Sequence, residues 1–125
     1  MKVAVYGTLR KGFGNNRLLE SSKFVGEGKI DNNWSLFVPV VDDKMVSFPY
    51  AVEETSDEGF VCEVYEIDDK TLKSLDYLEG YPSFYDRKEV EVELNGEKVT
   101  ASMYFVKKTQ VPSNAVKKNE YKRKY

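Results

Sequence analysis

Residues 88–106, KEVEVELNGEKVTASMYFV, carry the clearest structural signal in the chain. Charged and apolar residues alternate on both sides of the dipeptide Asn95-Gly96. Asn-Gly between two alternating runs is typical of a β-hairpin, because both residues accept the positive φ angles of a tight type I′ turn. The sequence therefore predicts two antiparallel strands, 88–94 and 98–106. Their charged residues are expected to form the solvated face of the hairpin.

Short apolar runs elsewhere predict more strands and little helix. Pro49 interrupts one of these runs, which indicates an edge strand or an irregular bend there. A short helix is expected through residues 17–19, capped by Asn15 or Asn16. The remaining predicted strands are 2–6, 23–30, 34–41, 46–52 and 60–67. Many short strands with few helices predict an α+β protein with a small, mixed, barrel-like sheet and short flanking helices.

Size and composition indicate one globular domain. The chain has 125 residues, of which 41% are hydrophobic, and no apolar run approaches the roughly 20 residues that span a bilayer. The start MKVAVYG lacks the apolar core of a signal peptide. Cys62 is the single cysteine, so the chain has no internal disulfide. Together these features lead us to expect a cytoplasmic protein that does not act on membranes.

The chain contains no histidine. This excludes Ser-His and Cys-His couples, metal sites built on histidine, and a histidine proton shuttle. Acid–base chemistry near neutral pH must therefore come from a carboxylate, a lysine, a tyrosine or Cys62.

Charge is distributed unevenly along the chain. Residues 107–125 contain seven Lys and Arg residues against one Glu, a net charge of +6, which leaves −8 for residues 1–106. A basic segment can bind nucleic acid or another anionic surface, or it can fold back on an acidic body. We favour the second interpretation. The sequence is thus divided into a domain of residues 1–106 and a basic C-terminal tail packed on it, with nucleic acid an unexpected partner.

Residues 68–82, DDKTLKSLDYLEGYP, predict a helix that starts after Asp68 or Asp69 and ends near Gly80. At about 100° per residue, Glu79 falls between Leu72 and Leu75 on the apolar face. Burial and the negative end of the helix dipole would both raise the pKa of this carboxyl, as a general base near pH 7 requires. If the helix frays before Glu79, the side chain instead points to water.

The first twelve residues, MKVAVYGTLRKG, predict a strand that stops at Gly7-Thr8. Two interpretations compete for this stop. It is either a turn by which the chain leaves a sheet, or a cradle of backbone N–H groups for a small anionic or carbonyl ligand. In the second case Arg10 or Lys11 would add positive charge near the ligand.

Five blocks together resemble the gamma-glutamylcyclotransferase-like superfamily, and most closely its gamma-glutamylaminecyclotransferases. In chain order the blocks are YGTLRKG (6–12), FPY (48–50), EVYEI (63–67), LDYLEGYP (75–82) and YDR (85–87). The resemblance implies a compact mixed α+β barrel. It also implies a reaction in which the α-amine of a gamma-glutamyl substrate attacks its own γ-amide. Ring closure releases 5-oxoproline and a free amine. Because the nucleophile belongs to the substrate, the resemblance implies neither cofactor nor metal.

The same resemblance implies roles for individual residues. Glu79 matches the catalytic acid/base, Tyr6, Gly7, Thr8 and Leu9 match the substrate-binding loop, and Tyr85 matches a pocket wall. Residues 10–16, 31–50 and 107–125 are least similar to the family and are expected to select the amine. The alternative function is a non-catalytic metabolite-binding or adaptor protein of the same fold.

Four other side chains receive mainly structural interpretations from the sequence. Cys62 alternates with Phe60 and Val64, so we expect a packed, unreactive thiol. Glu63 is expected to be a hydrogen-bonded structural carboxylate. Arg87 is expected to pair with Asp76. Tyr104 is either part of the core or a lining residue of the pocket.

Overall fold

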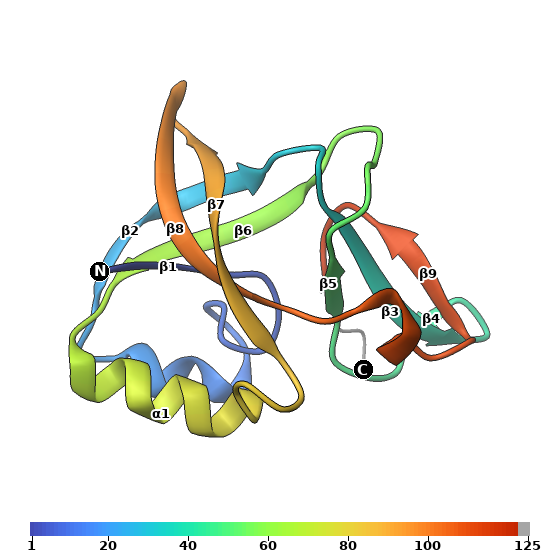
Figure 1. Ribbon diagram of the computed structural model, residues 1–125, viewed down its shortest axis with the longest axis horizontal. Coiled ribbons are helices and arrows are strands. Elements are labelled where there is room, and N and C mark those ends of the chain that lie inside the picture. Colours follow the sequence, from blue (N-terminus) through green and yellow to red (C-terminus); the bar gives the residue numbers. More distant parts are fainter. Residues whose placement is uncertain (123–125) are drawn as a thin grey trace.

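The computed structural model describes residues 1–122 of the chain. Within these residues five strands form a closed barrel, in the order β1 (Lys2–Val5), β6 (Phe60–Glu66), β2 (Lys23–Ile30), β7 (Asp86–Leu94) and β8 (Glu97–Phe105). All neighbours are antiparallel except β1 and β8, which close the barrel in parallel through Val3 and Ser102. Figure 1 shows this barrel beside a second, smaller sheet. The predicted α+β fold with a mixed barrel is confirmed.

The hairpin around Asn95-Gly96 forms as predicted. β7 and β8 pair from Asp86 with Phe105 to Leu94 with Glu97. Asn95 and Gly96 both have positive φ, 53° and 82°. The first strand begins at Asp86, two residues earlier than the alternation indicates. Val90 and Val92 are buried, while Glu89, Glu91 and Glu93 on either side of them face solvent, which accounts for the alternating sequence.

The second sheet lies beside the barrel and is built around β3 (Ser35–Val41). β3 pairs with β4 (Lys44–Met45), β5 (Tyr50–Val52) and β9 (Ala115–Lys118). The predicted strand 46–52 is only partly regular, because residues 46–49 form no strand before β5 begins. The irregular bend predicted at Pro49 is therefore present.

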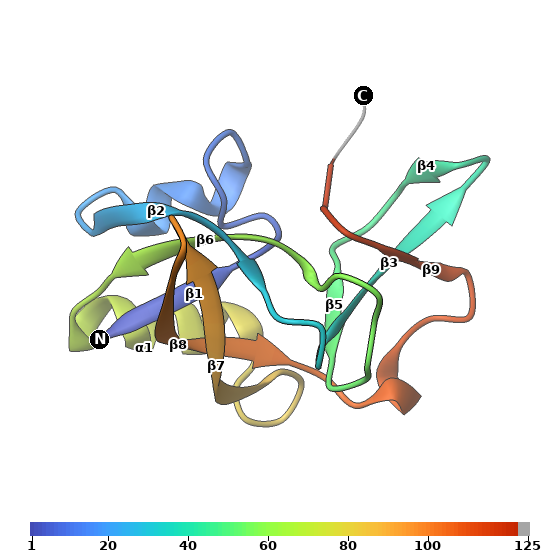
Figure 2. The ribbon, with the colours of Figure 1, turned by 90° about the horizontal axis from the view of Figure 1, so that it is seen from above.

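Residues 107–122, the described part of the basic segment, lie against the rest of the molecule. A short 3-10 helix, η2 (Lys108–Gln110), is followed by β9, which runs antiparallel along β3 (Figures 1 and 2). Two of the lysines bind one carboxylate: Lys108 and Lys117 lie 2.8 Å and 3.1 Å from the oxygens of Glu54. Part of the positive charge is thus paired with the acidic body.

The main helix, α1 (Asp69–Glu79), has the ends that its sequence predicts. Asp68 is the N-cap, and its carboxylate accepts a hydrogen bond from the Thr71 N–H at 2.8 Å. Gly80 ends the helix in the left-handed conformation, with φ 65°. Glu79 is the last helical residue, so the helix does not fray before it. No helix within residues 1–122 is long and apolar enough to cross a membrane.

The predicted asparagine caps of the first helix are wrong. η1 (Gly14–Leu19) is a 3-10 helix that begins after Phe13, without a capping side chain. Asn15 and Asn16 lie inside the helix, and their amides bind the preceding loop instead. Asn15 donates to the Thr8 hydroxyl at 2.9 Å, and Asn16 donates to the Leu9 carbonyl at 2.8 Å.

Alternation along the strands separates two cores. One fills the barrel and includes Ala4, Phe60 and Cys62, all almost fully buried. The other, which includes Val5 and Leu75, lies between the barrel wall and α1. Burial raises the pKa of the Cys62 thiol to about 12. This confirms the packed position predicted for Cys62, where little reactive thiolate forms.

Candidate active site

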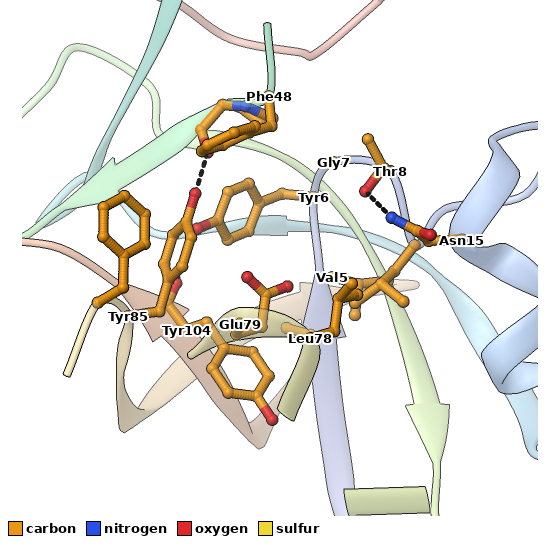
Figure 3. Close-up of a pocket in the computed structure, with 14 residues that line it drawn as sticks. Val5, Tyr6, Gly7, Thr8, Asn15, Phe48, Leu78, Glu79, Tyr85 and Tyr104 are labelled. Carbon is orange, nitrogen blue, oxygen red and sulfur yellow. Dashed lines mark hydrogen bonds between the residues drawn. The ribbon is translucent and has the colours of Figure 1, made fainter. Parts of the chain in front are cut away.

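A pocket of about 280 Å³ opens beside the end of β1 and the last turn of α1 (Figure 3). Its volume is near the lower limit of small-molecule sites, about 300 Å³. All six residues that the sequence analysis assigned to a site line this one pocket: Tyr6, Gly7, Thr8, Leu9, Glu79 and Tyr85. Tyr104, which the sequence analysis assigned either to the core or to the pocket, also lines the pocket.

Glu79 projects from α1 into the middle of the pocket (Figure 3). Within residues 1–122 its carboxylate makes neither a hydrogen bond nor an ion pair. Burial removes water from the charged form and raises the pKa of Glu79 to about 7. The carboxyl group can therefore both accept and donate a proton near neutral pH.

Tyr6, Tyr85 and Tyr104 form a fixed wall around this carboxylate. The Tyr6 hydroxyl donates to the Tyr104 carbonyl at 2.8 Å, and the Tyr85 hydroxyl donates to the Pro49 carbonyl at 2.8 Å. Burial, with a smaller contribution from the charge of Glu79, raises the pKa of Tyr6 well above its ordinary value. Burial also raises the pKa of Tyr85. Both phenols therefore remain neutral and serve as walls rather than as bases.

The loop after β1 is a tight turn whose central N–H groups have no partner. The Arg10 N–H donates to the Gly7 carbonyl at 3.1 Å, which closes the turn over Thr8 and Leu9. Among residues 1–122 no acceptor binds the N–H of Thr8 or Leu9. The amides of Asn15 and Asn16 hold this turn from the other side. Two adjacent free N–H groups at a pocket can bind a carboxylate or a developing oxyanion.

Gly7 is required for a reason that the sequence did not show. A Cβ built at Gly7 would lie 2.8 Å and 2.9 Å from Cγ and Cδ of Pro49. The Pro49 ring is buried and rigid, and its carbonyl binds Tyr85, so it cannot easily move away. Close packing of two loops therefore explains this glycine at least as well as close approach to a ligand.

Gly7→Ala is expected to lower the free energy of unfolding by about 1–3 kcal/mol, the usual cost of forcing an extra methyl group into a packed site. Urea denaturation measures the change, and calorimetry with 5-oxoproline measures binding. The double variant Gly7→Ala/Pro49→Ala separates the two explanations. If packing alone requires the glycine, the second substitution restores both stability and binding. Recovered stability with lost binding would instead favour the cradle.

The positive charge expected near the ligand is not in the pocket. Arg10 is 7% exposed and turns away from the cavity into a cluster of acidic residues. Its guanidinium lies 3.6 Å from Glu63 and 3.2 Å from Glu120, and it donates to the Tyr121 carbonyl at 3.1 Å. Lys11 instead lies over the Phe24 ring, 3.4 Å from its centroid. Both cations pair elsewhere because the turn at 7–10 reverses the chain.

Glu63 and Arg87 have the structural roles predicted for them. Glu63 is buried and accepts hydrogen bonds from the Lys11 N–H at 2.9 Å and the Tyr65 hydroxyl at 3.0 Å. Arg87 binds both oxygens of Asp76, at 2.8 Å and 3.2 Å. The Tyr104 hydroxyl donates to Asp76 at 2.6 Å. These bonds attach the third turn of α1 to the β7–β8 hairpin and so orient the helix end that carries Glu79.

Leu78 and Phe84 line the pocket although the sequence analysis assigned them no site role. Asn15 and Phe48 also line it, and they were named only as members of segments 10–16 and 31–50, which were expected to select the amine. Phe48 belongs to the FPY block, and Leu78 and Phe84 flank Glu79 and Tyr85 in the sequence. Their proximity to matched residues was a usable signal. Asn15 gave no such signal, because asparagine before a short helix is most simply read as a cap.

Comparisons with known proteins agree with this fold. A protein of Methanocaldococcus jannaschii named "Putative gamma-glutamylcyclotransferase" is 44% identical over 105 residues, which are 82% of each chain. Gamma-glutamylaminecyclotransferase B of Danio rerio is 30% identical over 95% of this chain and 65% of its own length. The crystal structure of an AIG2-like protein from Mus musculus superposes with a TM-score of 0.80 at 24% identity, covering 97% of this chain and 87% of the other.

The class defined by this barrel is that of the gamma-glutamylcyclotransferase-like folds. The family model described as "Gamma-glutamyl cyclotransferase, AIG2-like" matches residues 3–123, and the chain belongs to this family. The resemblance recognised in the sequence blocks is thereby confirmed. The match also continues through η2 and β9, well beyond the last of those blocks.

Proposed function

We propose that this protein is a gamma-glutamylcyclotransferase in which Glu79 transfers the protons. Family membership supports gamma-glutamylcyclotransferase activity in general. The observation that carries the finer proposal is the Glu79 carboxylate. It stands without a protein partner among the described residues, in the middle of the pocket, with a pKa of about 7.

The α-nitrogen must lose two protons as it changes from an ammonium to a lactam N–H, and the departing nitrogen must gain a proton before it can leave. The α-ammonium of the substrate loses a proton to Glu79, and the resulting amine attacks the γ-carbonyl carbon. A C–N bond forms within a five-membered ring, and the γ-amide C–N bond breaks. The proton held by Glu79 passes to the departing nitrogen, and the released amine takes up the second proton, which the new ring nitrogen must lose to become a lactam N–H. The products are 5-oxoproline and a free amine, and Glu79 returns to its starting state.

The remaining groups position the substrate and stabilise charge. The free N–H groups of Thr8 and Leu9 are suited to the oxygen that becomes negative as the amine attacks, or to the substrate carboxylate. The walls formed by Tyr6 and Tyr85 confine the glutamyl chain. Holding the amine close to its own carbonyl can supply several kcal/mol of the rate acceleration.

The proposal is tested by incubating the protein with gamma-glutamyl-ε-lysine, glutathione and simple gamma-glutamyl amino acids and amides, and by measuring 5-oxoproline. We expect kcat/KM to fall as the pH drops below about 7, because protonation removes the base form of Glu79. Binding of 5-oxoproline without turnover of any of these compounds would favour the alternative, a metabolite-binding protein. An acid limb near pH 4.5, the ordinary pKa of a glutamate, would contradict the role of Glu79.

A further inference from the structure

The mouth of the pocket carries three exposed apolar side chains: Phe48, Leu78 and Phe84. They are 43%, 41% and 41% exposed, although each lines the cavity. They come from three separate segments, namely the bend before β5, the last turn of α1, and the loop between α1 and β7. Exposed apolar side chains that converge at the opening of a cavity mark a binding surface. We call these three residues the apolar mouth.

The two phenylalanines of the apolar mouth are held by other rings. Phe48 lies 5.2 Å from the ring of Tyr50, and Phe84 lies 5.1 Å from the ring of Tyr85, measured between centroids. Phe48 and Phe84 themselves are 6.4 Å apart, with their rings nearly perpendicular. The Phe84 carbonyl also accepts a hydrogen bond from the Gln110 amide at 2.9 Å. The mouth is therefore a prearranged surface rather than a set of loose side chains.

The pocket and its mouth lack positive charge. Of the lining residues found within residues 1–122, none is Lys or Arg, and Glu79 is the single carboxylate. Two cations on neighbouring segments are paired with carboxylates: Arg87 binds Asp76, and Lys108 binds Glu54. A second carboxylate entering between Phe48 and Phe84 would lose water without gaining a cation, which is unfavourable.

Figure 3 shows how two residues of the apolar mouth, Phe48 and Leu78, lie relative to Glu79. Phe48 lies across the cavity from Glu79, and the Thr8–Asn15 pair lies on a further side. A glutamyl group whose reacting carbon is near Glu79 and whose oxygens meet the turn at Thr8 and Leu9 would direct its amide substituent toward the mouth.

We propose that the apolar mouth binds the leaving amine, and that this amine has an aliphatic or aromatic body without a carboxylate. The inference rests on the proposed function and names its substrate class: gamma-glutamyl amides of apolar amines. Bond changes are those of the cyclisation above, with the amine released carrying the proton from Glu79.

Three matched substrates test whether the mouth prefers an apolar amine without a carboxylate. Gamma-glutamyl-phenethylamide and gamma-glutamyl-phenylalanine differ only by the carboxylate, and gamma-glutamyl-ethylamide lacks the ring. We expect kcat/KM for the phenethylamide to exceed that for each of the other two by about tenfold or more, the scale of discrimination by a small apolar pocket. Equal or faster release of 5-oxoproline from gamma-glutamyl-phenylalanine would overturn the inference and leave the proposed function intact.

Variants of the apolar mouth test which side chains produce the preference for the phenethylamide over the ethylamide. Phe48→Ala and Phe84→Ala are expected to reduce the ratio of phenethylamide to ethylamide turnover about tenfold, mainly through KM. Tyr77→Ala removes an exposed aromatic side chain that does not line the pocket and should leave the ratio unchanged. A ratio unaffected in both phenylalanine variants, with folding verified by thermal denaturation, would contradict the assignment. If the three compounds yield no 5-oxoproline, and gamma-glutamyl-ε-lysine, glutathione and simple gamma-glutamyl amino acids yield none either, the proposed function itself fails.

Discussion

Glu79→Gln is expected to lower kcat by about 100-fold or more, the usual contribution of a positioned acid–base group. The substitution preserves the volume of the side chain and removes only its ability to exchange a proton. Since the carboxylate makes no contact with a partner among the described residues, the fold should be retained. The measurement is the rate of 5-oxoproline release under saturating substrate.

Glu89→Gln is the matched control. Glu89 lies on β7, is exposed and does not line the pocket, so its loss should leave kcat unchanged. Wild-type turnover by the Glu79→Gln protein would show that another group moves the proton.

Glu79→Gln should also change the stability of the protein in a pH-dependent way. The pKa of Glu79 is about 7 in the folded protein, above its ordinary value of 4.5, so the folded state binds the proton more tightly than the unfolded chain. The stability that this proton provides is fully present below about pH 4.5 and is lost as the pH rises through about 7. Glu79→Gln should therefore have a higher Tm than the unmodified protein above pH 7, and a similar Tm near pH 4.

Arg10→Met is expected to lower the free energy of unfolding by about 3–5 kcal/mol, the cost of leaving a buried charge without its partner. The guanidinium is the cation next to Glu63, whose side chain is 7% exposed. It also joins the turn at residues 7–10 to the Tyr121 carbonyl. Urea denaturation followed by fluorescence measures the change.

Two further variants test whether the loss of stability in Arg10→Met comes from leaving the Glu63 charge without its partner. Arg17→Met removes an exposed arginine from η1 and should change stability little. In Arg10→Met/Glu63→Gln the stranded charge is absent, so the double variant should recover part of the loss. An unchanged denaturation midpoint in the single variant would mean that the cluster adds nothing to stability.

The sequence predicted the features that local signals encode. Asn95-Gly96 identified the hairpin, and Asp68 and Gly80 bounded α1, because turn and cap preferences act over a few residues. The helical period then placed Glu79 on the inner face. The family resemblance identified the loop of residues 6–9 and Tyr85 as candidate site residues. The structure brings these residues into the same pocket as Glu79.

The missed features all depend on contacts between distant segments. Arg10 was a candidate for positive charge near the ligand, but its partner carbonyl, that of Tyr121, is 111 residues away. Gly7 looked like a residue kept small for a ligand, yet its neighbour is Pro49. The position of β9 depends on pairing with β3, which no local preference predicts. Asn15 and Asn16 were assigned to caps because their true acceptors lie behind them in the chain.

Closure of the barrel determines when in folding the pocket can form. On the ribosome β1 is made about a hundred residues before its parallel neighbour β8, and the Tyr6 hydroxyl reaches a carbonyl 98 residues away. Such non-local pairing slows folding, because the entropy of closing a long loop must be lost before its contacts form. The pocket draws its walls from both ends of this loop. Binding competence should therefore arise late and all at once, since no nascent fragment lacking β8 contains the site.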